Sequence, residues 1–186
     1  KLYPDKVADI VKGVAHGCEL AGCALLGGET AEMPGFYQND EYDLAGFAVG
    51  IVDRKDLVDG SAVREGDALI GLASSGVHSN GYSLIRKLFR IDALSLSSAP
   101  YPLQEPLGDV FLTPTKIYAK SALSLMENFE VHGAAHITGG GFFENIPRIL
   151  PEGLRARIET DAWEMPAVFR LIQRQGELEL DAMFGT

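Results

Sequence analysis

The stretch "ALIGLASSGVHSNGYSLIRKLF", Ala68–Phe89, contains the transition that decides the fold. Its first seven residues form a short apolar run typical of a buried strand, whereas Asn80–Phe89 carries apolar side chains at helical spacing. Between these segments, Ser74–Asn80 is rich in glycine and hydroxyl groups. A helix N-terminus presents unpaired N–H groups and partial positive charge, so this corner is a candidate anion site.

The same alternation continues on both sides of this unit. Helices are expected at Asp5–Ala21, with Gly22 as its cap, and from Thr113-Pro114 to about Phe129. Two more helices are expected at about Phe142–Leu150 and at Pro166–Gln175. The stretch 94–109 is expected to be a surface loop. Further strands are expected at 23–28, 42–52, 134–138 and 154–159. Strands alternating with helices predict an α/β or α+β layered architecture, and the charged, turn-rich stretch 53–67 predicts a domain boundary near Asp59.

Composition restricts the function classes. With 186 residues, of which 46% are hydrophobic, the chain can bury a core and form one domain or two small ones. The net charge of −10 argues against duplex nucleic acid or a membrane surface as the main partner. Neither a membrane-length apolar run nor a signal peptide is recognisable, so the cytoplasm is the expected compartment. Cys18 and Cys23 indicate packing rather than a disulfide or a metal pair.

A second glycine-rich corner lies in "HITGGGF", where Thr138, Gly139, Gly140 and Gly141 separate an expected strand from an expected helix. Such a corner can bind a phosphate through its backbone, although many turns use glycine only to change direction. Each of the two corners has a histidine beside it, His78 or His136. Either imidazole could move a proton, or could simply donate a structural hydrogen bond.

A third corner, "GGETAEMPG", places Glu29 and Glu32 on a loop after an apolar run. Mg²⁺ is commonly held by one or two carboxylates together with substrate phosphates, but the same carboxylates could only solvate the loop. His16 and His132 are interpreted as structural. No zinc ligand set, nucleophile elbow or Walker A lysine is recognisable.

Three long motifs, "GGETAEMPGFY", "SSGVHSNGYSLIRK" and "HITGGGFFENIPRILP", occur in this order, with "YDLAGFAVGIVD" and "LTPTKIYAKS" between them. Together they resemble the AIR synthetase family of phosphoribosylformylglycinamidine cyclo-ligases, and the resemblance covers essentially the whole chain. It implies that 1–58 is the C-terminal part of an ATP-binding domain. It also implies that 59–186 is the family's C-terminal α/β domain, incomplete at its end.

The activity implied by this resemblance is ATP-dependent closure of formylglycinamidine ribonucleotide to aminoimidazole ribonucleotide, with release of ADP and phosphate, in purine biosynthesis. The implied ATP and Mg²⁺ site comprises Gly27, Gly28, Glu29, Thr30 and Glu32, with Glu29 as the metal ligand. The implied substrate site comprises Ser75, Gly76, His78, Ser79, Asn80 and the four residues from Thr138 to Gly141. His78 or His136 would transfer the proton, a monovalent cation stays open as a further cofactor, and the full-length form would be a homodimer.

Two alternatives remain. Other enzymes of the superfamily, such as formylglycinamidine synthetase and selenophosphate synthetase, share the architecture and the phosphate chemistry. The family's long N-terminal half does not precede Lys1, so the chain could instead be a non-catalytic binding or assembly module. On this reading a polypeptide of these residues alone is expected to lack cyclo-ligase activity and to expose apolar surface before Asp59.

Overall fold

The computed structural model describes residues 2–185, apart from the side chains of residues 93 and 94. The chain divides into two compact units. The first runs up to Leu57 and includes Ile117–Phe129, and the second comprises Val58–Lys116 and the chain from Glu130 onward. Each unit is described by itself below.

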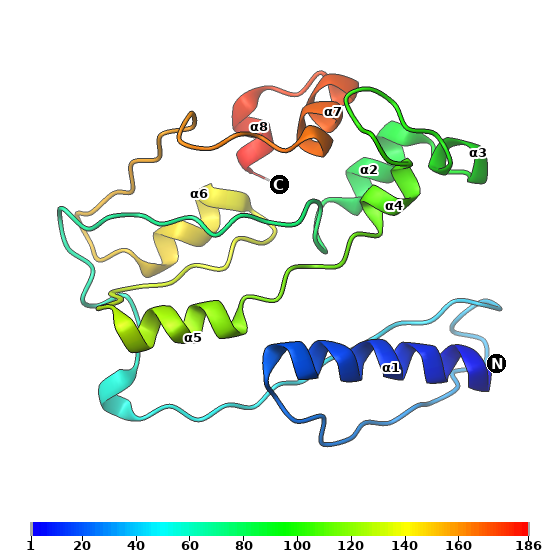
Figure 1. The fold of residues 1–186 in the computed structure, drawn as a ribbon, viewed down its shortest axis with the longest axis horizontal. Coiled ribbons are helices and arrows are strands. Elements are labelled where there is room, and N and C mark those ends of the chain that lie inside the picture. The colour runs from blue at the N-terminus through cyan, green and yellow to red at the C-terminus, as the bar shows by residue number, and fades with distance from the viewer. Residues whose placement is uncertain (1, 186) are drawn as a thin grey trace. The chain divides into compact units, whose positions relative to one another are not determined.

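The first unit contains α1 (Pro4–Ala21), the 3₁₀ turn η1 (Arg54–Asp56) and α5 (Ala119–Asn128). Figure 1 shows the N-terminal end of α5 near the C-terminal end of α1, where Lys120 comes close to Gly22. Pro4 occupies the first turn of α1, and Gly22 ends the helix in the left-handed conformation (φ 77°). The predicted end and cap of this helix are therefore confirmed, and its start lies one residue earlier than expected.

Apolar side chains of the first unit are largely exposed. Neither α1 nor α5 contains a buried residue, and Leu26, Phe47 and Ile51 are at least 95% exposed. Cys18 and Cys23 are free, in line with the expectation of no disulfide, but Cys23 is exposed rather than packed. The unit thus presents an apolar surface along 44–52, as expected from the sequence.

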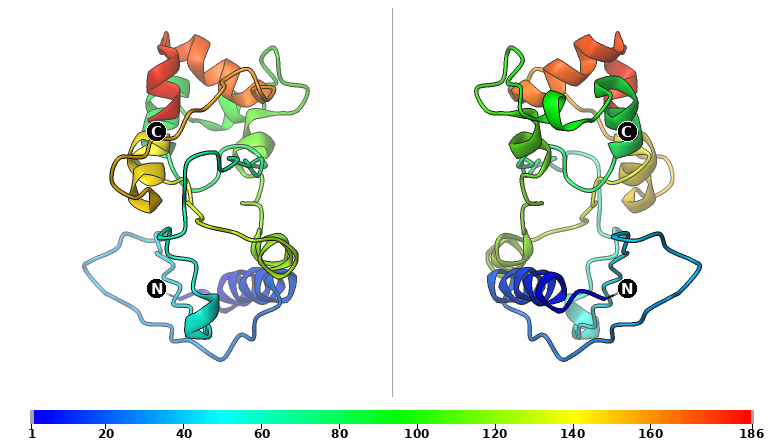
Figure 2. Two further views of the ribbon diagram at one scale, coloured as in Figure 1. Left: turned by 90° about the vertical axis from the view of Figure 1, so that its left-hand side faces the viewer. Right: turned by 90° about the vertical axis from the view of Figure 1, so that its right-hand side faces the viewer.

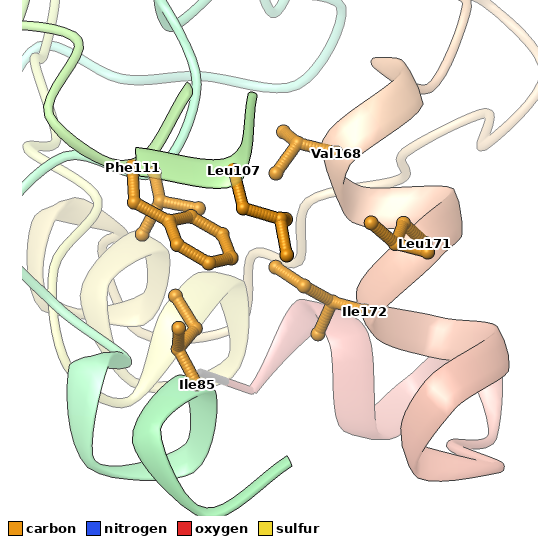
Figure 3. Packing of buried hydrophobic residues seen from close by; sticks show 7 residues of the cluster. Ile85, Leu107, Phe111, Val168, Leu171 and Ile172 are labelled. Carbon is orange, nitrogen blue, oxygen red and sulfur yellow. The ribbon is translucent and has the colours of Figure 1, made fainter. Parts of the chain in front are cut away.

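In its described residues, up to 185, the second unit contains seven helical elements: α2 (Tyr82–Phe89), α3 (Ala93–Leu96), α4 (Leu107–Phe111), α6 (Gly141–Asn145), η2 (Ile146–Ile149), α7 (Ala167–Gly176) and α8 (Leu180–Phe184). Its core lies between α2, α4 and α7, where Ile85, Leu107 and Phe111 meet Leu171 and Ile172 (Figure 3). Ile85 is 2% exposed, so α2 is fixed by burial of one face.

An aromatic cluster holds α6 and α8 together. The rings of Phe142 and Phe184 are stacked, with centroids 5.2 Å apart, and Trp163 meets both of them edge-on. Both views in Figure 2 show the C-terminal end of the chain beside the segment that contains α6. The glycine-rich corner before α6 is consequently supported from one side by the end of the chain.

The expected strands do not form in residues 2–185, so the α/β prediction is not confirmed. The five segments have no ladder partners: backbone hydrogen bonds outside the helices join residues close in sequence, the widest being Leu107 N–H to the Ser98 carbonyl. An alternating or apolar pattern favours an extended chain, but a strand exists only where a second one pairs with it.

One helix prediction and one loop prediction also need correction. The helix expected from Thr113-Pro114 begins only at Ala119, because 113–116 contacts the Ser74–Asn80 corner and the Thr113 hydroxyl donates to the Asp109 carbonyl (3.2 Å). The stretch 94–109, expected to be a loop, begins in α3 and ends in α4. No helix in the described part of the chain is long and apolar enough to cross a membrane.

Candidate functional site

The Ser74–Asn80 corner is held in place by residues of its own that are buried. Gly76 and Val77 are buried, and Val77 (5% exposed) belongs to the core formed with α2, α4 and α7. The flanking Ser75, Ser79 and Asn80 are exposed, and α2 begins after Gly81. A buried apolar residue in the middle of a polar turn fixes the backbone and leaves the hydroxyl and amide side chains toward solvent.

His78 connects this corner to a second segment. Its Nε2 accepts hydrogen bonds from the backbone N–H of Ser75 (3.1 Å) and of Lys116 (3.4 Å), and lies 3.0 Å from the Ser75 hydroxyl. Burial lowers the pKa of His78 below its usual value, and the neighbouring His136 lowers it further. Because an atom that accepts from two backbone N–H groups carries no proton, the imidazole is neutral with its proton on Nδ1.

The second segment, 113–116, contributes polar groups that the sequence analysis did not assign to the site. The Ser75 hydroxyl donates to the Pro114 carbonyl (2.8 Å), and the Ser79 and Thr115 hydroxyls lie 3.4 Å apart. The segment also brings the backbone of Lys116 to His78. The Thr113-Pro114 pair is typical of a helix start, so the sequence pattern does not indicate the contribution of Thr115 and Lys116.

The Thr138–Gly141 corner is organised by Asn145, which is only 4% exposed. Its Nδ2 donates to the carbonyls of Gly141 (2.7 Å), Gly139 (3.3 Å) and Thr138 (3.4 Å). Its Oδ1 accepts from the Thr138 hydroxyl and from Arg148 Nη1, both at 3.3 Å. In a planar trans peptide the N–H points away from the carbonyl, so N–H groups of this loop face away from Asn145.

Asn145 was also missed by the sequence analysis. The only signal available was an asparagine beside Glu144 in "FFENIP", where a polar residue on a buried helix face requires hydrogen-bond partners. The sequence does not indicate that those partners are the carbonyls of the preceding loop.

The two corners of the second unit lie close together. A Cβ atom on Gly139 would be 3.9 Å from Asn80 Oδ1, and the charge of His136 acts on His78. The structure thus groups Ser75, His78, Ser79 and Asn80 with His136 and the Thr138–Gly141 loop. Hydroxyl, amide and imidazole groups on exposed, firmly held backbone suit a polar ligand with several hydrogen-bonding groups.

The third corner, 27–32, belongs to the first unit. Gly27, Gly28, Glu29, Thr30 and Glu32 are all exposed, and Glu32 accepts a hydrogen bond from the Leu2 N–H. Within residues 2–185 no group of three or more His, Cys, Asp or Glu side chains could hold a metal ion.

His132 forms its hydrogen bonds with residues outside the three glycine-rich corners. Its Nδ1 is 2.7 Å from Asp67 Oδ2 and its Nε2 is 3.2 Å from Glu130 Oε1. Hydrogen bonds to Asp67 and then Glu130 raise the pKa of His132, whereas the hydrogen bond from His132 lowers the pKa of Asp67. This arrangement is an ion pair joining two loop segments of the second unit.

The chain is similar to known proteins along its whole length. The profile of the AIR synthase related protein, C-terminal domain, matches residues 64–185, and that of the corresponding N-terminal domain matches residues 1–52. A relative from Desulfitobacterium hafniense, named phosphoribosylformylglycinamidine cyclo-ligase, is 60% identical over 100% of this chain and 54% of its own length. Relatives of the same name from Caldicellulosiruptor bescii and Geotalea daltonii are 60% and 57% identical.

The chain spans about half the length of the curated relatives that it matches. The two family profiles together cover most of its residues, in the order in which the N- and C-terminal domains occur. The chain therefore belongs to the AIR synthase related family.

Proposed function

We propose that the protein containing this chain is a phosphoribosylformylglycinamidine cyclo-ligase. The reaction would be the ATP-dependent closure of formylglycinamidine ribonucleotide to aminoimidazole ribonucleotide, with release of ADP and phosphate. The main support is the identity of about 60% across all of the chain to relatives of that name. The polar groups gathered around His78 and Asn80 are compatible with a phosphorylated sugar as ligand.

We also propose that two domains share the reaction. We assign residues 1–58 to the ATP-binding domain and 59–186 to the C-terminal domain, in agreement with the profile matches at 1–52 and 64–185. Gly27, Gly28, Glu29, Thr30 and Glu32 would face ATP, with Glu29 as the carboxylate toward Mg²⁺. We further propose that the extended segments pair as strands in the whole protein, which would operate in the cytoplasm as a homodimer, in keeping with the exposed apolar surface along 44–52.

For the substrate, we propose that the corner from Ser75 to Asn80 and the loop from Thr138 to Gly141 hold the ribonucleotide, with a loop N–H facing its phosphate. Such a site lowers the barrier by positioning and by neutralising charge, so it requires no covalent nucleophile. ATP, when bound, would supply a phosphoryl group to convert the formyl oxygen into a leaving group. Of the two histidines, the exposed ring of His136 is better placed to exchange a proton than His78, whose Nε2 is engaged by backbone N–H groups.

The test is an assay of ADP release with formylglycinamidine ribonucleotide, ATP and Mg²⁺, together with detection of the aminoimidazole product. It compares the 186-residue chain with a protein of the relatives' full length that carries these residues. We expect substrate-dependent release and product only in the longer protein. Turnover of a different superfamily substrate, such as selenide, without cyclisation would favour the alternative enzymes.

A further inference from the structure

The contacts of His78 define a role that is separate from proton transfer. Three groups surround its Nε2: the N–H of Ser75, the N–H of Lys116 and the Ser75 hydroxyl. A backbone N–H donates only, so a proton on Nε2 would point at two donors. Nε2 is therefore committed as an acceptor and is unavailable as the atom that delivers a proton.

These contacts join two parts of the chain that are far apart in sequence. Ser75 and His78 belong to the corner before α2, whereas Lys116 belongs to the segment that precedes α5. Two further contacts act between the same segments, from the Ser75 hydroxyl to the Pro114 carbonyl (2.8 Å) and between the Ser79 and Thr115 hydroxyls (3.4 Å). The imidazole is the only side chain of this set that contacts the backbone of both segments.

We propose that His78 is a positioning residue: its Nε2 holds segment 113–116 against the Ser74–Asn80 corner, and this brings the Thr115 hydroxyl beside that of Ser79 to bind the ligand. The expected effect of this contact on catalysis rests on the proposed function. It extends the site to Thr115 and Lys116, and it leaves proton transfer to another group.

Two substitutions separate positioning from acid–base chemistry. His78→Gln places an amide oxygen near the position of Nε2, so it can accept from the same two N–H groups, but it does not titrate. His78→Ala removes the acceptor. His16→Gln on α1, where the ring is exposed, is the matched control for losing a histidine.

In the full-length protein, we expect His78→Ala to lower kcat/KM on the order of 100-fold, mainly through KM for the ribonucleotide, because misplaced groups cost about that much. His78→Gln should retain kcat/KM within about threefold and keep the pH profile of kcat. If His78 were the proton carrier, Gln would lower kcat by about 10²–10⁴-fold and remove one limb of the profile. That result would overturn the proposal.

A readout without turnover keeps this inference distinct from the proposed function. In the full-length protein without ligands, ¹⁵N spectra of the histidine rings should show His78 with Nδ1 protonated and Nε2 bare. Amide exchange at Ser75 and Lys116 should be faster in His78→Ala and near wild type in His78→Gln. A protonated Nε2, or unchanged exchange in His78→Ala, would refute the positioning role. If the wild type released no ADP in response to the substrate, only the proposed function would be refuted.

Discussion

Asn145 Nδ2 donates to the Gly141 carbonyl at 2.7 Å, and this bond joins the last residue of α6 to its first, where the glycine-rich loop ends. The donor lies on α6, four residues after its acceptor, so the helix and its N-terminal loop fix each other. Since the same amide also reaches Gly139 and Thr138, one side chain determines which way several peptide groups of the loop face.

Replacement of Asn145 should therefore cost more than its size suggests. Asn145→Ala removes the hydrogen bond to the buried Gly141 carbonyl and those to the less buried groups of Gly139 and Thr138, so we expect the unfolding free energy to fall by about 1–3 kcal/mol. Urea unfolding followed by circular dichroism measures this. The matched control is Asn128→Ala, which removes one exposed hydrogen bond to the Ser124 carbonyl (2.8 Å) and should cost much less. Equal losses in both variants would contradict the assigned role of Asn145.

Gly141 provides a second test of the same loop. It has a left-handed φ of 58°, and a Cβ atom there would overlap the Phe184 carbonyl oxygen at the end of α8. We expect Gly141→Ala to destabilise the protein by more than about 3 kcal/mol, because backbone strain and a clash with main chain act together. Gly153→Ala, at φ 84° with no atom near the added Cβ, should cost only the strain of about 1–2 kcal/mol. Thermal unfolding of both variants decides the comparison.

The parts of the fold that the sequence predicted correctly are those set by local patterns. The apolar stripe, the proline and the glycine cap of α1 all act within one turn of the helix, and α2 and α7 carry similar stripes. The start of α5 was missed because Pro114 and Lys116 are held by Ser75 and His78, about 40 residues earlier. Local propensity carries no information about such contacts.

The candidate site residues also fall into those that local sequence indicates and those that depend on distant contacts. Glycine, hydroxyl and histidine clusters could be located from composition alone, and the structure places His78 and Asn80 near His136 and Gly139. Their roles remain proposals. Asn145, Thr115 and Lys116 could not be identified in advance, because each acquires its meaning from a partner in another segment.

The core of the second unit makes a third prediction. Ile85 belongs to the core cluster shown in Figure 3 and is 2% exposed, so Ile85→Ala should remove about 2–5 kcal/mol of stability by leaving a cavity. Leu123→Ala on α5, where the side chain is 57% exposed, removes a comparable number of carbons and should have a much smaller effect. Midpoints of urea unfolding should differ accordingly, and a smaller loss for Ile85→Ala than for Leu123→Ala would contradict the assigned core.

The ion pair of His132 and Asp67 predicts a defined pH dependence. The pKa of His132 is raised in the folded protein, so its contribution is full below the unfolded value of about 6.5 and is lost as pH rises through the folded value. The pKa of Asp67 is lowered, so its contribution is present above about 3.9 and is lost as pH falls through the folded value. The pair should thus stabilise the protein most between about pH 4 and 6.5.

We expect His132→Gln to reduce Tm more at pH 6 than at pH 9, measured by scanning calorimetry. His16→Gln, which alters an exposed histidine 3.7 Å from Glu19, should show little difference between the two pH values. A His132→Gln deficit that is constant from pH 6 to 9 would mean that the imidazole stabilises by packing, because only a protonated ring has charge to lose.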